Sequence, residues 1–427
     1  MFRWLNINNK NISIIAIGAW LILGFLYCQH TPIGHRNHDF YGHIEYTKII
    51  ATQHRLPLPH EGWQTYHPPL YYLINNFIGP SIVTSEENHI NFVRALSVIY
   101  GAIFLWFIAW FLENFSLSPQ SKLLSLLFIA TIPKFSITFS TYNNDSLATL
   151  FAVSILTISY KLYQNWSNKL AICLLAVTTL AFYTKYTAFL CIFVLVIICL
   201  RRLLNFKLPN LKETKILGVI ALSVVLFIPY IYIHNFKHTG KIFPGNAEQG
   251  LGMNLAISDD RSILSTVLRI PALQQDSNEW NDPWAHGYTR PETKKHDYWA
   301  FSFLTSIYGE VVYEKPGIGL FWILIWIHLA CILLALTIVM KSVVTRLAGT
   351  AILLGHLSQI ILMLKTILPG ACTMDYRYIC WLWVFWALLY SHVLDERNMF
   401  SFLFNRIIVV GIVVQIYILL TMTGNAS

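Results

Sequence analysis

The chain has 427 residues, of which 56% are hydrophobic and only 12% charged, and its mean hydropathy is +0.53. A soluble protein of this length would need far more charged residues to cover its surface. The net charge of +9 fits a membrane protein with basic cytoplasmic loops. No polar segment interleaves runs of Lys and Arg with aromatic residues, so we expect no nucleic-acid partner.

Apolar runs long enough to cross a bilayer as helices recur from end to end. The first is longer than the apolar core of a usual signal peptide, so we expect a retained signal anchor. In chain order the expected spans are 11–28, 91–112, 123–140, 147–160, 170–184, 187–200, 216–234, 316–340, 347–366, 377–394 and 407–423. The sequence therefore predicts an all-α polytopic membrane protein with about eleven transmembrane helices and two large external loops.

The break at 183–187 fits either a turn between two spans or a polar point in one bent helix, and two spans agree better with the distribution of charge. With the N-terminus in the cytoplasm, most Lys and Arg residues of the short connections fall inside, as the positive-inside rule requires. The two long loops, about 29–90 and 235–315, then lie outside. We expect residues 1–400 to form one transmembrane domain, and 401–427 to add a final helix and a short external tail.

The first external loop begins with an unusually polar string, HDFYGHIEY, at residues 38–46. Asp39, His43 and Tyr46 are spaced i, i+4, i+7, so a helix would place them on one face, and Glu45 would project elsewhere. On chemistry alone, a solvated loop with aromatic anchors fits equally well.

Later in this loop, Pro68 and Pro69 impose an extended entry to a short helix over 70–78. We expect this helix to lie at the membrane interface with Tyr71 and Tyr72 at headgroup level.

Five motifs follow in order: D-x-x-x-H-x-x-Y from Asp39, H-P-P-L-Y-Y from His67, N-N-D-S-L-A from Asn143, T-K-Y-T-A from Thr184, and R-Y at Arg377. Together they resemble the polytopic glycosyltransferases of the GT-C class, which use polyprenyl-phosphate sugars. This class includes protein O-mannosyltransferases and lipid A aminoarabinose transferases. The resemblance spans about residues 10 to 395.

The resemblance implies a membrane glycosyltransferase that moves a sugar from a polyprenyl-phosphate carrier to an acceptor hydroxyl on the external face. It implies Asp39 as the base that takes the hydroxyl proton, with inversion at the sugar. A bacterial inner membrane, with the site facing the periplasm, is the expected location. Lys185 and Arg377 lie at the outer ends of spans, where cations can stabilise the departing phosphate; a snorkelling lysine and an interfacial anchor are the alternatives.

The remaining candidates for substrate binding are His43, His67, Tyr71, Asp145 and Tyr378. Asp145 also fits a helix N-cap, which is the more ordinary role for an acid after two asparagines. His67 equally fits a histidine that packs the loop. The loop tryptophans, including Trp63, fit either stacking on sugar faces or the interface belt. His328 and His356 fit histidines that are hydrogen-bonded inside the helix bundle.

Many members of the resembled class carry Asp-Glu at the acidic position, whereas Phe40 follows Asp39 here. Because the carboxylate pair that would clamp a hard cation is missing, we expect no divalent metal cofactor and a monophosphate donor. The expected partners are the polyprenyl-phosphate-linked sugar, a lipid, glycan or protein acceptor, and the bilayer.

A multi-span secondary transporter, or a lipid-linked sugar flippase without transferase activity, is the alternative function. Transporters usually show inverted repeats with broken helices at the midplane. Here the polar residues concentrate on the outer face and in two large loops, which favours chemistry on a lipid-borne substrate. A non-catalytic membrane scaffold is a third possibility, and the presence of Asp39 counts against it.

Overall fold

The computed structural model describes residues 9–34, 37, 39–191, 229–242, 267, 298–308, 318–365, 375–396 and 398–422. These residues form α-helices and 3₁₀-helices with no strand among them, which confirms the predicted all-α class. The chain divides into two compact units. Unit 1 comprises Met1–Pro32, Ile108–Thr138 and Asn254–Ser427, and unit 2 comprises Ile33–Phe107 and Phe139–Met253.

Six described helices are long and apolar enough to cross a membrane: Asn11–His30, Glu86–Leu112, Asp145–Gln164, Val343–Leu362, Tyr376–Asp395 and Met399–Thr421. The pair Pro119–Thr131 and Pro133–Ser140 would make a seventh span, bent by 66° at the break between its halves. Pro133 lacks the N–H that would continue the helix, which explains the break. The chain is therefore an integral membrane protein, and several of the predicted spans, including 187–200 and 216–234, extend beyond the described residues.

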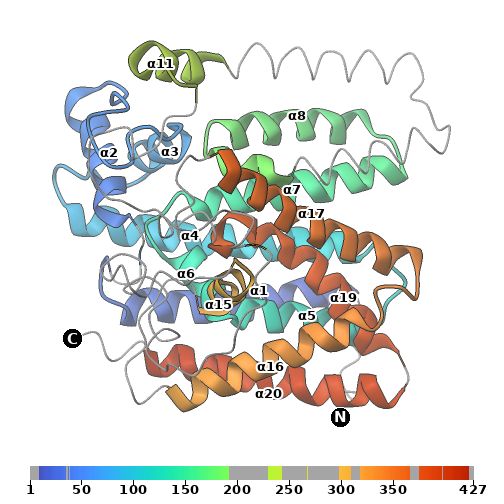
Figure 1. The fold of residues 1–427 in the computed structure, drawn as a ribbon. Helices are drawn as coiled ribbons and strands as arrows, with labels where there is room; N and C mark the ends of the chain where they lie inside the picture. Colours follow the sequence, from blue (N-terminus) through green and yellow to red (C-terminus); the bar gives the residue numbers. More distant parts are fainter. Residues whose placement is uncertain are drawn as a thin grey trace. The chain divides into compact units, whose positions relative to one another are not determined.

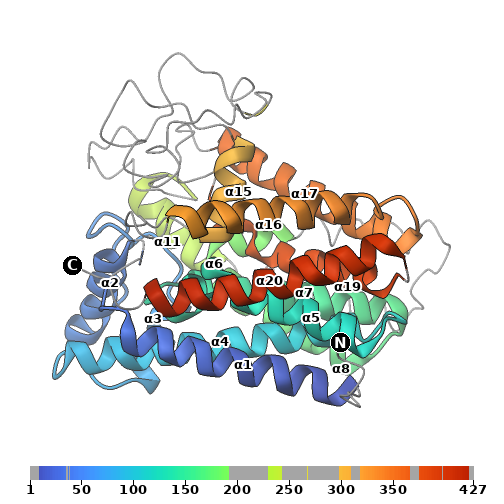
Figure 2. The same cartoon turned by 90° about the horizontal axis from the view of Figure 1, so that it is seen from below.

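Unit 1 is a helical bundle in which α5 packs against α1, α19 and α20, and α16 lies along α20 (Figures 1 and 2). Its elements are α1 (Asn9–His30), α5 (Pro119–Thr131), α15 (Tyr298–Tyr308), α16 (Ile318–Leu336), α17 (Val343–Lys365), η5 (Tyr376–Leu382), α19 (Trp383–Asp395) and α20 (Met399–Met422). Two further helices, α4 (Glu86–Leu112) and α6 (Pro133–Ser140), pass from one unit into the other.

Buried polar side chains tie the helices of unit 1 together. Gln415 Nε2 on α20 is 2.8 Å from His328 Nε2 on α16, and Thr131 Oγ1 on α5 donates to Gln415 Oε1 at 2.5 Å. The hydroxyl of Tyr298 is 2.9 Å from His356 Nδ1. Hydrogen bonds of this kind satisfy polar groups that lipid cannot. The prediction that His328 and His356 are hydrogen-bonded within the helix bundle is confirmed, with His328 buried and His356 half-buried.

Unit 2 contains α2 (Phe40–Gln53), α3 (Leu70–Ile78), α7 (Asp145–Gln164), α8 (Asn168–Phe182), η1 (Tyr186–Cys191) and α11 (Pro229–Thr239). α7 and α8 lie side by side (Figure 1), joined by a short connection. Helix α8 ends at Phe182 and η1 begins at Tyr186, so the predicted break at 183–187 is confirmed. His38, residues 192–228 and most of the second loop lie outside the described residues.

The short helix predicted over 70–78 is confirmed as α3, but its orientation differs from our expectation. Tyr71 and Tyr72 are fully buried, whereas Leu73, Phe77 and Ile78 are exposed. The reason is that α3 packs against α2, and the ring of Tyr72 stacks on Tyr46 with centroids 3.7 Å apart. The two tyrosines therefore contact protein and not lipid headgroups, and the opposite face of α3 is the apolar face left open.

Candidate active site

The H-P-P and T-K-Y-T motifs, far apart in sequence, lie next to each other in unit 2. The backbone N–H of Leu70 donates to the carbonyl of Tyr183 at 2.8 Å. In the other direction, the hydroxyl of Tyr186 donates to the carbonyl of Tyr66 at 2.8 Å. Asn235 on α11 adds a bond from its Nδ2 to the same hydroxyl, also at 2.8 Å. These hydrogen bonds thus hold the N-terminal end of α3 against the segment between α8 and η1.

Tyr142, directly before the N-N-D motif, connects that motif to α2. Its hydroxyl is 2.7 Å from Thr47 Oγ1 and 3.1 Å from His89 Nε2. The other ring nitrogen of His89, Nδ1, is 2.7 Å from the carbonyl of Pro80. A carbonyl only accepts, so in a neutral imidazole Nδ1 carries the proton and Nε2 accepts from Tyr142. Burial raises the pKa of Tyr142, which keeps this hydroxyl protonated.

Sequence analysis did not identify Tyr142 or His89 as members of this cluster. In the sequence, only the position of Tyr142 immediately before Asn143 indicated that this tyrosine belongs to the cluster. With these contacts, the motifs beginning at Asp39, His67, Asn143 and Thr184 all meet within unit 2.

Asp39 occupies a special backbone position at the N-terminus of α2. Its φ and ψ are 60° and 18°, in the left-handed region, which Asp enters more readily than most non-glycine residues. Its side chain makes no capping bond to the helix. Instead, Oδ1 accepts a hydrogen bond of 2.6 Å from the indole Nε1 of Trp63. The carboxylate is therefore held by the loop between α2 and α3, while Asp39 stays partly exposed.

Behind Asp39, α2 presents His43 and Tyr46 on one buried face, as their spacing predicts, while Glu45 is exposed. His43 Nδ1 is 2.8 Å from the hydroxyl of Tyr72, and the Tyr46 hydroxyl donates to the carbonyl of His67 at 3.1 Å. The rings of His43 and His67 are nearly parallel, with centroids 6.4 Å apart. Burial raises the pKa of Tyr46 and Tyr72, so both hydroxyls stay protonated.

His43, His67 and Tyr71 are all buried, and the ring of Tyr71 meets His43 edge-on at 6.4 Å between centroids. These three predicted binding residues therefore form an aromatic layer that supports the loop around Asp39. Their direct contact with a substrate stays a prediction.

Asp145 and Lys185 form a buried ion pair in the same unit. Lys185 Nζ donates to Asp145 Oδ1 at 2.6 Å, and each side chain is only 6% exposed. Asp145 is the first residue of α7 and Asn144 holds the N-cap position, while Asn143 Oδ1 accepts the Asp145 N–H at 2.8 Å. The snorkelling alternative for Lys185 is wrong, since its ammonium is enclosed by protein.

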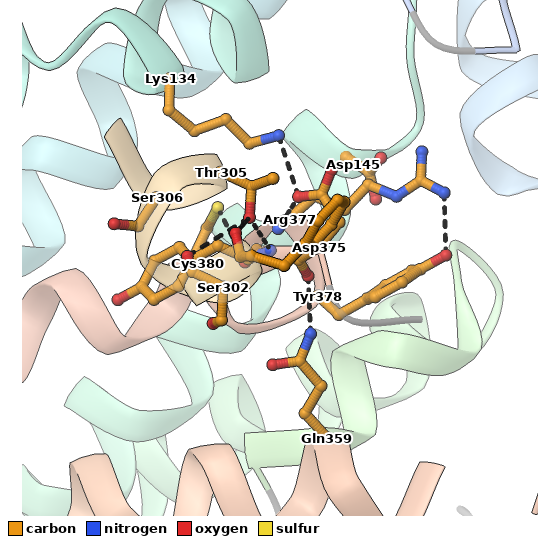
Figure 3. A network of polar contacts seen from close by, with 12 residues as sticks. Lys134, Asp145, Ser302, Thr305, Ser306, Gln359, Asp375, Arg377, Tyr378 and Cys380 are labelled. Carbon is orange, nitrogen blue, oxygen red and sulfur yellow. Dashed lines mark hydrogen bonds and ion pairs between the residues drawn. The ribbon is translucent and has the colours of Figure 1, made fainter. Parts of the chain in front are cut away.

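Arg377 and Tyr378 belong to unit 1, in a polar network around Asp375 (Figure 3). Asp375 Oδ1 accepts from Lys134 Nζ at 3.2 Å and from the backbone N–H of Arg377 at 2.6 Å. Gln359 Nε2 donates to the carbonyl of Asp375 at 2.7 Å. The guanidinium of Arg377 donates to the Tyr378 hydroxyl at 2.9 Å. Sequence analysis missed Asp375, although it lies two residues before Arg377.

In the part of the chain that the structure describes, no three His, Cys, Asp or Glu side chains gather to share a metal ion. The expectation that transfer needs no divalent metal concerns the whole protein and stays a prediction.

Residues 66–233 match the family described as dolichyl-phosphate-mannose-protein mannosyltransferase. This segment includes the H-P-P-L-Y-Y, N-N-D-S-L-A and T-K-Y-T-A motifs and ends before Arg377. No curated protein matches the chain significantly. The family match confirms the resemblance to GT-C glycosyltransferases, and together with the apolar helices it supports a membrane glycosyltransferase of that type.

Proposed function

We propose that this membrane glycosyltransferase moves a sugar from a polyprenyl monophosphate to an acceptor hydroxyl on the external face of the membrane. The match over residues 66–233 supports a lipid-linked donor. The observation that carries the proposal is the half-buried carboxylate of Asp39, hydrogen-bonded to Trp63 at 2.6 Å in the same unit as the matched motifs. A bacterial inner membrane, with the site facing the periplasm, is the location we propose.

In the proposed reaction, Asp39 accepts the proton of the acceptor hydroxyl as its oxygen attacks the anomeric carbon. The bond between that carbon and the phosphate oxygen breaks, and the polyprenyl phosphate leaves with the bonding electrons. The attacking oxygen and the leaving phosphate occupy opposite faces of the sugar, so a single displacement inverts the anomeric centre.

The departing phosphate gains negative charge, which Lys185 and Arg377 are proposed to stabilise. Lys185 is already paired with Asp145, but an ammonium has three N–H donors and can serve a phosphate oxygen while keeping this partner. Arg377 donates one N–H of its guanidinium to the Tyr378 hydroxyl, and a guanidinium binds phosphate oxygens through paired N–H donors.

A lipid-linked sugar flippase without transferase activity is the second candidate. The 66° break between Pro119–Thr131 and Pro133–Ser140 favours it, because transporters often build their sites from discontinuous helices. The buried Lys134–Asp375 pair in unit 1 is the kind of intramembrane charge that such proteins use.

The two candidates are separated by the lipids of cells that lack the protein. Transferase function predicts that a polyprenyl monophosphate sugar accumulates on the external leaflet, detected by mass spectrometry and by surface oxidation of its sugar. The wild-type chain should clear this lipid and Asp39→Asn should not. Accumulation on the cytoplasmic leaflet would support the flippase, and accumulation of a diphosphate-linked sugar would contradict the proposed donor.

A further inference from the structure

We propose that Trp63 is a positioning residue for the reaction: its indole N–H orients the Asp39 carboxylate toward the acceptor hydroxyl. This inference rests on the proposed function, because it assigns Trp63 a task only if Asp39 is the base. It also replaces the two roles that the sequence suggested for this tryptophan, sugar stacking and the interface belt.

The hydrogen bond between the two side chains runs in one direction. An indole N–H can only donate, so Trp63 supplies the hydrogen and Asp39 Oδ1 accepts it, at 2.6 Å. A bond this short to a carboxylate has the strength of a charge-assisted hydrogen bond. It fixes the rotation of the carboxylate about its Cβ–Cγ bond, and thereby the direction in which the basic oxygens point.

The helix does not provide this orientation. A carboxylate at the start of a helix commonly turns back to cap the free N–H groups, but the left-handed backbone of Asp39 leaves α2 without such a bond. The hydrogen bond from Trp63 therefore holds a carboxylate that the helix itself does not orient.

Trp63 is itself held by close packing of its loop on α2. A Cβ on Gly42 would lie 3.2 Å from the Cβ of Trp63 and 2.7 Å from the Cγ of Gln64. On the loop side, a Cβ on Gly62 would collide with the carboxylate of Glu45. Two glycines thus let the loop and the helix approach each other on either side of the tryptophan.

The loop also has its own internal bonds. Thr65 Oγ1 accepts the N–H of Gly62 at 3.0 Å and donates to the carbonyl of Pro59 at 3.1 Å. A tryptophan in a fixed loop can hold a base in the geometry that a proton transfer requires, and small displacements of a catalytic group are costly to the rate.

The test is Trp63→Phe, which keeps the aromatic ring and removes the donor. The donor is the polyprenyl monophosphate sugar purified from a strain that lacks the protein. It is added to membranes from the same strain after each variant has been expressed in it, and transfer of the sugar is measured. We expect kcat to fall about 10-fold or more, as for a misplaced catalytic group, with the KM for the lipid donor unchanged. Trp166→Phe is the matched control, because it also removes an indole N–H donor, here one that binds Asn168 Oδ1 at 2.9 Å in a solvent-exposed hydrogen bond.

A double-mutant cycle distinguishes orientation of Asp39 from a general effect on the fold. If Trp63 acts through the carboxylate, Trp63→Phe has no further effect in the Asp39→Asn background. An equal loss in both backgrounds, or full kcat in the single Trp63→Phe variant while Asp39→Asn is inactive, would overturn the inference. Full activity of Asp39→Asn would instead overturn the proposed base, so the two failures are distinguishable.

Discussion

Lys185 Nζ lies 2.6 Å from Asp145 Oδ1, and the pair joins two motifs that are 40 residues apart in sequence. Both side chains are buried. In such a place the loss of one partner is far more damaging than the pair itself is stabilising, because a buried charge is left uncompensated. The ion pair therefore holds the segment between α8 and η1 against the N-terminal end of α7.

The first prediction follows from this burial. Lys185→Met and Asp145→Asn should each lower the free energy of unfolding by about 3–5 kcal/mol. The double variant should lose less than the sum, because neither charge is then left alone. Thermal unfolding in detergent measures the effect. Lys48→Met, in the exposed pair of Lys48 and Glu86, is the control and should change the melting temperature little. Additive losses would show that the two side chains do not interact.

The second prediction concerns Asp39. Asp39→Asn keeps the size of the side chain and can still accept from Trp63, but it cannot take up the proton of an acceptor hydroxyl. Transfer should fall by a factor of roughly 10² or more, within the range of general-base contributions, with the amount of protein in the membrane unchanged. Glu45→Gln, on the exposed side of the same helix, should retain activity. A fully active purified Asp39→Asn enzyme would exclude Asp39 as the base.

Sequence patterns predicted much of unit 2. The break at 183–187, the bounds of α3 and the shared face of His43 and Tyr46 all follow from local rules: apolar run length, proline at a helix start and the 3.6-residue period. The orientation of α3 does not follow from local rules, because a tyrosine is amphipathic and can face either lipid or protein. Which face is buried depends on α2, and that is a tertiary contact.

The candidate site was predicted in part for the same reason. The motifs identified Asp39, Lys185 and Asp145, but their partners are non-local. No periodicity relates Trp63 to Asp39, Tyr142 to Thr47, or Asp375 to Lys134. These pairs depend on chain folding across tens to hundreds of residues, which a single sequence does not encode in any local pattern.

The third prediction concerns the donor and metal. Because cations are the proposed partners of the phosphate, transfer from a polyprenyl monophosphate sugar should persist in excess EDTA. The assay compares monophosphate and diphosphate donors side by side with purified protein. Activity that returns only with added Mg²⁺ or Mn²⁺, or that is seen only with the diphosphate, would require metal-assisted chemistry.

The fourth prediction concerns topology. The eleven spans and the cytoplasmic N-terminus that the sequence predicts would place the C-terminus outside, so a reporter fused after Ser427 should show periplasmic activity. A fusion in the connection between α7 and α8, at Trp166, should show cytoplasmic activity and serves as the reference. Cytoplasmic activity of the fusion after Ser427 would mean that the number of spans is even.

The fifth prediction tests the orientation of α3. Phe77 is 90% exposed, and the open apolar face that it shares with Leu73 and Ile78 should contact lipid. A benzophenone-bearing phenylalanine placed at position 77 should crosslink to phospholipid on irradiation in membranes. The same group at position 45, on the polar side of α2, should not. Labelling at 45 in preference to 77 would reverse the proposed orientation.

The left-handed backbone of Asp39 also restricts which residues this position can accept. Aspartate and asparagine, with short polar side chains, enter this conformation far more readily than other residues except glycine. Lengthening the acid to glutamate would therefore strain the main chain as well as move the carboxylate. Asparagine or glycine would leave the start of α2 undisturbed. The changes that position 39 accepts most easily thus abolish the proposed chemistry while preserving the fold. A gene altered in this way would encode a stable protein that binds the lipid donor without transferring its sugar.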